Sequence, residues 1–261
     1  MEVYRTDFTV EHKSDDSPLT LADRQAHNII TNHLLPLGIP ILSEEGKSIP
    51  YSERSMWDTL WIVDPLDGTK EFIKRNDEFT VNIALVRNRV PELGVIFVPV
   101  KNSLYFGCSN RGAYLLGNVE MLSHLCDSGK ASDATPDLRE IINGSRRLPI
   151  ARPGDTPYVI VGSRSHATPE LETFVEEQRA RFKQVEFVSA GSSLKFCLVA
   201  EGKAAIYPRL GPTMEWDTAA GHAIAASSGA KVYRHDTGTP LLYNREDLLN
   251  PWFIVEFNTG N

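Results

Sequence analysis

The sequence of 261 residues contains only three cysteines, Cys108, Cys126 and Cys197, and none of them belongs to a Cys-x-x-Cys pair. An odd number of widely spaced cysteines argues against a disulfide framework and a structural zinc site, and it favours a reducing compartment. The sequence also has no apolar run long enough to cross a bilayer. We therefore expect a cytoplasmic protein, and leave open a peripheral association with the inner membrane.

An excess of positive charge is also missing. The chain has 27 Lys and Arg residues against 34 Asp and Glu residues, which gives a net charge of -7. Such a balance provides no general basic surface for nucleic acid. We expect a small-molecule substrate, and if that substrate is anionic, local cations or a metal must hold it. The length allows one large domain or two packed ones.

Residues 59–72 carry two acids at the end of an apolar run. Leu60 to Val63 predicts a buried strand, which should stop at Asp64 because Pro65 lacks a backbone donor. Asp67 to Thr69 then predicts a turn that opens a short helix. Paired carboxylates suit a hard cation such as Mg²⁺, and a helix start suits phosphate. Asp-Pro and Asp-Gly are also common turn formers, so this stretch alone leaves both interpretations open.

The order of predicted elements favours an α/β protein. A helix should run from Thr20 to Pro36, with Asp23 one turn inside, and a short strand over 39–42 precedes Glu44. Residues 79–116 read as an antiparallel meander of short strands. After a connector at 146–155, strands and helices alternate up to Ser228, which predicts a largely parallel sheet. We expect two lobes, residues 1–145 and 146–261.

A second set of polar residues lies in the later part of the chain. Asp217 opens a helix, either as its N-cap or as a carboxylate that faces the first acidic turn across a cleft between the lobes. Lys195 lies one turn into another helix and is either solvated or directed into that cleft. Ser163 and His166 follow a strand and are candidates for the same crevice.

Three motifs in order carry a resemblance. Ser43-Glu44-Glu45, the DPLDGT string at 64–69 and the WDTAAG string at 216–221 resemble the inositol monophosphatase superfamily of magnesium-dependent, lithium-sensitive phosphatases. The longer strings at 64–76, 79–85, 191–202 and 211–223 are similar to its CysQ branch of 3'(2'),5'-bisphosphate nucleotidases, which serves sulfur assimilation. The resemblance runs from about Lys13 to the C-terminus. It implies a two-lobed, layered α/β/α/β/α sandwich of the inositol monophosphatase and fructose-bisphosphatase type.

The resemblance also implies roles for single residues. It implies two or three Mg²⁺ ions held by Glu44, Asp64, Asp67, Asp217 and the backbone carbonyl of Leu66, with Asp23 near a weaker third position. The attacking water would be oriented by Thr20, Thr69 and Glu44. The implied substrate contacts are Asp67, Gly68, Thr69, Ser163, His166, Gly191, Lys195, Arg209 and Asp217.

The implied reaction removes the 3'-phosphate of adenosine 3',5'-bisphosphate by attack of a metal-activated water, giving AMP and phosphate. The alternative is an inositol or sugar monophosphatase, and a remote one is a silent nucleotide sensor, which the complete motifs disfavour. A covalent aspartyl phosphatase would need Asp where this chain has Pro65. We expect a monomer or homodimer. Family members usually have a further helix before the Lys13 region, so we also expect poor coverage of Ile29 and Ile30.

Overall fold

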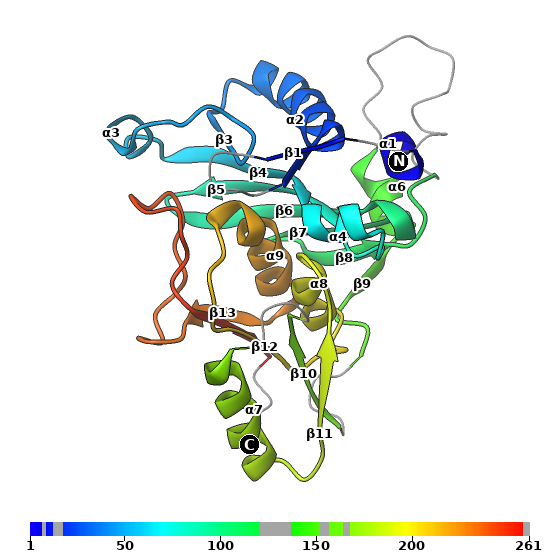
Figure 1. Ribbon diagram of the computed structural model, residues 1–261, viewed down its shortest axis with the longest axis vertical. Helices are drawn as coiled ribbons and strands as arrows, with labels where there is room; N and C mark the ends of the chain where they lie inside the picture. The colour runs from blue at the N-terminus through cyan, green and yellow to red at the C-terminus, as the bar shows by residue number, and fades with distance from the viewer. Residues whose placement is uncertain (7–8, 13–17, 121–136, 152–156, 164–167, 258–261) are drawn as a thin grey trace.

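The computed structural model describes residues 1–6, 9–12, 18–120, 137–151, 157–163 and 168–257. In these residues the chain forms two large sheets and one small two-stranded sheet (Figure 1). The seven-stranded sheet has the order β3-β4-β5-β6-β7-β8-β9. Its strands are β3 (Ile41–Ser43), β4 (Thr59–Asp67), β5 (Thr80–Arg87), β6 (Val90–Val98), β7 (Ser103–Cys108), β8 (Gly112–Leu116) and β9 (Arg146–Leu148). All neighbours pair antiparallel except β3 and β4, so the predicted meander is confirmed.

Strand β4 does not end where the sequence predicts. It continues to Asp67, but its register against β5 shifts between Asp64 and Asp67. The shift falls where Pro65 cannot donate to the ladder, so the proline produces a bulge rather than a stop. Helix α4 (Thr69–Lys74) follows at once, after Gly68 at φ +92°. That conformation favours glycine, because a side chain there would be strained.

The second sheet has five strands in the order β11-β10-β12-β14-β13. They are β10 (Tyr158–Gly162), β11 (Val185–Ser189), β12 (Ile206–Arg209), β13 (Lys231–Arg234) and β14 (Phe253–Glu256). Strand β10 runs parallel to β11 and β12, but β14 runs antiparallel to β12 and β13. The prediction of a largely parallel sheet is therefore right for its first half and wrong for its second half.

Helices cover and separate the two sheets. Figure 1 shows α2 (Leu21–Leu34) above the seven-stranded sheet, α8 (Leu194–Ala200) and α9 (Glu215–Ser228) between the sheets, and α7 (Pro169–Arg181) outside the five-stranded sheet. This order of layers confirms the α/β/α/β/α sandwich. Helix α9 packs closely on β6 and α8 because a glycine stands at each contact. A Cβ on Gly94 would lie 2.2 Å from the Ala220 carbonyl, and one on Gly221 would lie 2.4 Å from the Phe196 ring.

The remaining elements are short and lie mostly near the N-terminus. They are α1 (Glu2–Arg5), β1 (Val10–His12), β2 (Pro18–Thr20), the 3-10 helices Leu35–Leu37 and Pro99–Lys101, α3 (Tyr51–Arg54) and α6 (Leu138–Asn143). Helix α2 has the predicted span, but Asp23 is its one fully buried residue. Ile29 is 61% exposed, which confirms the expected poor coverage at that residue, whereas Ile30 is half-buried.

The boundary between lobes at residues 145 and 146 stays a prediction. Strand β9 begins at Arg146 and pairs with β8, so the predicted connector starts inside the first sheet. Among the described helices, none has both the length and the apolar character needed to span a bilayer.

Candidate functional site

Three carboxylates from distant parts of the chain meet at one point. Asp64 and Asp67 stand on the bulged end of β4, and Asp217 stands in the first turn of α9. One oxygen from each lies within 4.8 Å of the others. Packing α9 between the sheets therefore brings Asp217 to the acidic turn. This confirms the alternative in which the Asp217 carboxylate faces that turn.

Glu44 reaches the same point from the neighbouring strand. Strands β3 and β4 are parallel, so their carboxyl ends lie side by side, and the Glu44 amide donates to the Val63 carbonyl at 3.1 Å. Burial raises the pKa of Asp64 well above its ordinary value, and the nearby Glu44, Asp67 and Asp217 carboxyls raise it further. The side-chain hydrogen bond between Asp64 and Glu44 acts in the same direction.

Burial also raises the pKa of Asp217 to about 8, with Asp67 as the next cause. Buried acids of like charge are costly without a partner. A set of carboxylate oxygens is the donor set that Mg²⁺ prefers, so the residues present fit this cation. Leu66 is buried, its amide donates to Asp64 Oδ1 at 2.9 Å, and its carbonyl lies 3.3 Å from Thr69 Oγ1. A role for that carbonyl in metal binding stays a prediction.

Asp217 also caps its own helix. Its Oδ2 accepts a hydrogen bond from the Met214 amide at 2.8 Å, while its carboxylate belongs to the acidic group. The prediction of Asp217 as the N-cap is wrong, because the N-cap is Met214 and Asp217 is the third residue of α9. From that position its carboxylate can bind the N-cap amide and also belong to the acidic group, because a carboxylate has more than one acceptor position.

Thr20, Asp23 and Thr69 form a chain of hydrogen bonds beside the acidic group, in which Thr20 and Asp23 are buried and Thr69 is half-buried. Asp23 Oδ2 accepts from the Thr20 amide at 2.7 Å and from Thr20 Oγ1 at 2.5 Å. Thr69 Oγ1 lies 3.2 Å from Asp23 Oδ1, to which it can donate. These contacts give Asp23 a role in holding Thr69, and a weaker third metal position at Asp23 stays a prediction.

Three residues absent from the sequence-based site, Ser193, Asn82 and Thr80, contact Asp67 through their side chains. Ser193 Oγ lies 2.9 Å from Asp67 Oδ2 and 2.7 Å from the Asp217 carbonyl, and it can donate its one proton to either oxygen. Asn82 Nδ2 donates to Asp67 Oδ2 at 3.2 Å and to Ser193 Oγ at 3.0 Å. Thr80 Oγ1 lies 3.4 Å from Asp67 Oδ2, and all three side chains are buried. The available signal was a pair of polar residues, Thr80 and Asn82, inside the mostly apolar strand 79–85.

A cavity of about 430 Å³ opens beside the acidic group. Its wall contains several residues predicted from the sequence, together with Glu78, Phe196, Tyr207, Met214 and Leu249. The predicted members are Asp67, Gly68, Ser163, Gly191, Lys195, Arg209 and Asp217. His166 lies outside the described residues.

Three cations line this cavity, Lys70, Lys195 and Arg209, and the last two differ in their surroundings. Lys195 is buried, and its Nζ donates to the Ser192 carbonyl at 2.6 Å and the Ala190 carbonyl at 3.3 Å. Burial lowers the pKa of Lys195 to about 8. Arg209 donates to the Pro212 carbonyl, and its buried Nε has no acceptor among the described residues. An unsatisfied guanidinium donor in a cavity wall suits an anionic ligand.

Comparison with known proteins gives one family. The model of the inositol monophosphatase family matches residues 1–252. The 3'(2'),5'-bisphosphate nucleotidase CysQ of Shigella flexneri is 45% identical over 261 residues, covering 98% of this chain and 92% of the relative. The same enzyme of Escherichia coli K12 is also 45% identical, with the same coverage.

Solved structures agree. CysQ from Bacteroides thetaiotaomicron, described as a bacterial member of the inositol monophosphatase family, has 52% sequence identity and a TM-score of 0.86. The similarity covers 99% of this chain and 92% of that one. Staphylococcal inositol monophosphatase-1, soaked in lithium chloride, shares the fold with 20% identity and a TM-score of 0.68.

Proposed function

The chain belongs to the inositol monophosphatase family, and from this premise we propose that it removes the 3'-phosphate of adenosine 3',5'-bisphosphate to give AMP and phosphate. The observation that carries the proposal is the near-full-length similarity to CysQ bisphosphate nucleotidases at 45% to 52% identity. An acidic group beside a cavity with a buried guanidinium donor supports it. The chain is thus an enzyme of the phosphoric monoester hydrolase class.

We assign the metal ligands from the donor set. Asp64, Asp67 and Asp217 would hold Mg²⁺, with Glu44 and the Leu66 carbonyl completing positions for two or three ions. Bound Mg²⁺ supplies positive charge that neutralises the phosphate oxygens and makes a neighbouring water more acidic.

The Thr20–Asp23–Thr69 chain orients the nucleophile. When the Thr69 hydroxyl donates to Asp23, its oxygen lone pairs are left to accept a hydrogen bond from water. Asp23 stays in place because Thr20 donates to it through both its amide and its hydroxyl. These groups fix the direction of a water hydrogen, and so leave the water lone pair to face the phosphorus. Gly68 and Thr69, at the start of α4, would contact the transferred phosphate.

The second phosphate distinguishes this substrate from inositol phosphate. We assign it to Arg209, because its Nε is a buried donor without an acceptor in the described chain. Lys195 would act mainly by holding the 190–192 loop, with its charge as support. Ser163 and Gly191 would contact the nucleoside portion.

The test is phosphate release with Mg²⁺ from adenosine 3',5'-bisphosphate and inositol 1-phosphate, with and without lithium. We expect a preference for the bisphosphate of at least tenfold in kcat/KM, loss of activity with EDTA, and suppression by lithium. Asp64→Asn should lower kcat by at least a hundredfold, because it removes a charge from the acidic group. Full activity of Asp64→Asn would overturn the assigned site.

In the same assay, Arg209→Ala tests whether Arg209 binds the second phosphate. It should raise KM for the bisphosphate at least fivefold and leave KM for inositol 1-phosphate nearly unchanged. Arg179→Ala, at an exposed arginine of α7 that pairs with Glu176, is the matched control. Preference of the unaltered enzyme for inositol 1-phosphate would support the monophosphatase alternative instead.

A further inference from the structure

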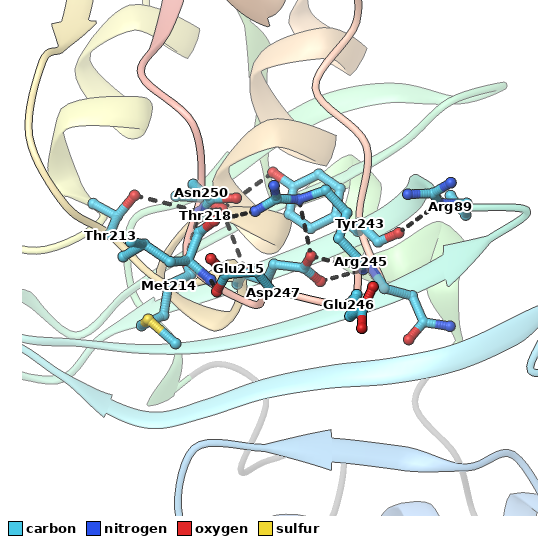
Figure 2. A network of polar contacts seen from close by, with 12 residues as sticks. Arg89, Thr213, Met214, Glu215, Thr218, Tyr243, Arg245, Glu246, Asp247 and Asn250 are labelled. Atoms are coloured by element: carbon cyan, nitrogen blue, oxygen red, sulfur yellow. Dashed lines mark hydrogen bonds and ion pairs between the residues drawn. The ribbon is translucent and has the colours of Figure 1, made fainter. Parts of the chain in front are cut away.

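The chain crosses the start of α9 a second time on its way to the last strand. Between β13 and β14 it runs over this helix end, and we call residues 241–250 the strap (Figures 1 and 2). The Glu215 amide donates to the Leu248 carbonyl at 3.0 Å, and the Asn250 amide donates to the Thr213 carbonyl at 2.8 Å. The strap therefore lies directly against residues 213–215, two positions before the metal ligand Asp217.

Glu215 binds the strap from inside the protein. Its side chain is 0% exposed. Oε2 accepts from the Asn244 amide at 2.6 Å, and Oε1 accepts from the Arg245 amide at 3.0 Å. The Arg245 guanidinium adds an ion pair at 3.4 Å, as Figure 2 shows. A buried carboxylate with these partners fixes the strap by its backbone rather than by packing alone.

Asn250 closes the other end of the strap on the same helix start. Its Nδ2 is within reach of the Met214 carbonyl at 2.8 Å and Thr218 Oγ1 at 3.0 Å (Figure 2). Tyr243 donates to the same Thr218 hydroxyl at 3.2 Å. The first turn of α9 is thus held on both sides of Asp217.

Arg54 connects the strap to the lobe that carries the other acids. This buried residue of α3 donates to Asn244 Oδ1 at 3.2 Å and to the Glu246 carbonyl at 2.7 Å. Asn244 Nδ2 returns a hydrogen bond to the Arg54 carbonyl at 2.6 Å. In the sequence, α3 lies between Glu44 and Asp64, so the strap joins both sources of the acidic group.

Helix geometry separates the tasks of the two acids. Residues two apart on an α-helix point about 200° apart, so Glu215 faces the strap while Asp217 faces Asp64 and Asp67. Met214, whose amide donates to Asp217, lies in the cavity wall together with Leu249 of the strap. Movement of the strap would therefore displace both the metal ligand and the cavity wall.

We propose that Glu215 is a positioning residue for the phosphatase reaction: by holding the strap against α9, it aims Asp217 at the acidic group and sets Met214 and Leu249 in the cavity wall. Removing the carboxylate leaves two buried backbone N–H groups without their acceptor, so the strap must shift to hydrate them. The expected effect on turnover of the bisphosphate rests on the proposed function, whereas the expected effect on Mg²⁺ binding does not.

The test compares Glu215→Gln with the unaltered protein by calorimetric Mg²⁺ titration and by steady-state kinetics with adenosine 3',5'-bisphosphate. Glutamine offers one acceptor oxygen where two amides need one each. We expect the Mg²⁺ Kd to rise at least fivefold, and KM and kcat to change together in the unfavourable direction.

Glu201→Gln is the matched control, because Glu201 is also buried, accepts from Tyr105 OH at 2.9 Å and pairs with Lys203. It should lose stability but keep the Mg²⁺ Kd. Arg245→Met is the second variant, in case Glu215→Gln does not fold. This change removes the ion pair and the hydrogen bond to the Leu249 carbonyl, and should raise the Mg²⁺ Kd two- to threefold.

The positioning role of Glu215 would be overturned if Glu215→Gln and Arg245→Met both lower the stability but leave the Mg²⁺ affinity unchanged. If the unaltered protein binds Mg²⁺ but does not hydrolyse the bisphosphate, the proposed function fails. The Mg²⁺ titrations would then still decide the role of Glu215.

Discussion

His222 is a base that the fold keeps uncharged. It is buried in α9, its Nδ1 lies 3.2 Å from the Tyr243 hydroxyl, and burial lowers its pKa to about 4. In the unfolded chain the pKa is about 6.5. Between these values the unfolded state binds the proton and the folded state does not. The contribution of His222 to stability is therefore present above pH 6.5 and is lost as pH falls toward 4.

We predict that His222→Gln flattens the dependence of stability on pH between 7 and 5. The unaltered protein should lose up to about 3 kcal/mol more than the variant across the full titration, because about 2.5 pKa units separate the two states. Urea denaturation at stepped pH measures the difference. Asn28→Gln, at an exposed and uncharged residue of α2, should leave the slope unchanged. Equal slopes for all three proteins would contradict the prediction.

At the level of single residues, the sequence identified residues whose type is unusual for their position in a predicted element. Asp64, Asp67 and Asp217 stood out as acids at element ends, and the structure brings them together. Ser193 and Asn82 did not stand out, because their importance comes from touching Asp67 across a long sequence separation. Glu215 was passed over beside Asp217, because its partners lie in a strap without regular structure.

Helix α1 shows how a short element depends on one side chain. Four residues cannot form a stable helix alone, so its position depends on packing. The buried Tyr4 ring lies 5.0 Å from Phe72 and 4.9 Å from Phe79, and its hydroxyl donates to Asp77 at 2.6 Å. Phe72 belongs to α4, the helix that begins at Thr69. Tyr4 therefore braces the helix behind the acidic turn.

We predict that Tyr4→Ala lowers the free energy of unfolding by about 2–4 kcal/mol, because it leaves a cavity between two aromatic rings. Tyr4→Phe keeps the rings and should cost about 1 kcal/mol for the lost hydrogen bond. Tyr4→Ala should also reduce kcat several-fold, through α4, and Tyr4→Phe should not. Tyr114→Ala, in the sheet at β8, is the control that lowers stability without changing kcat. A wild-type kcat for Tyr4→Ala would contradict the bracing role.

Elements with local sequence signals were predicted well, and elements defined by distant partners were not. The meander and α2 follow from apolar periodicity, and α7 follows from Thr168 and Pro169 at its start. Strands β13 and β14 pair across the strap, and no local signal shows that pairing. Helix α2 has apolar residues at helical spacing, yet Ile29 is exposed, because the spacing predicts a helix and not what covers its face.

For the whole molecule, the acidic group exists only where α9 docks. Asp64 and Asp67 belong to the seven-stranded sheet, while Asp217 comes from a helix between the two sheets. The family resemblance predicted this architecture, but residue patterns alone would have left the cleft between lobes as one alternative among several. A metal that binds all three acids must therefore stabilise the docked state.

We predict that Mg²⁺ raises the melting temperature of the unaltered protein and that EDTA reverses the rise. At one hundred times Kd the gain is about 2.7 kcal/mol, or roughly 5–10 °C for a chain of this size.

Asp217→Asn should abolish most of this shift in melting temperature. Because like charge and burial raise the pKa of Asp217, the amide should also make the metal-free protein at least as stable as the unaltered one. The two proteins would then exchange rank when Mg²⁺ is added, as scanning calorimetry can measure. A variant that is less stable than the unaltered protein in EDTA, yet keeps the full Mg²⁺ shift, would show that Asp217 serves α9 as a cap and not the metal.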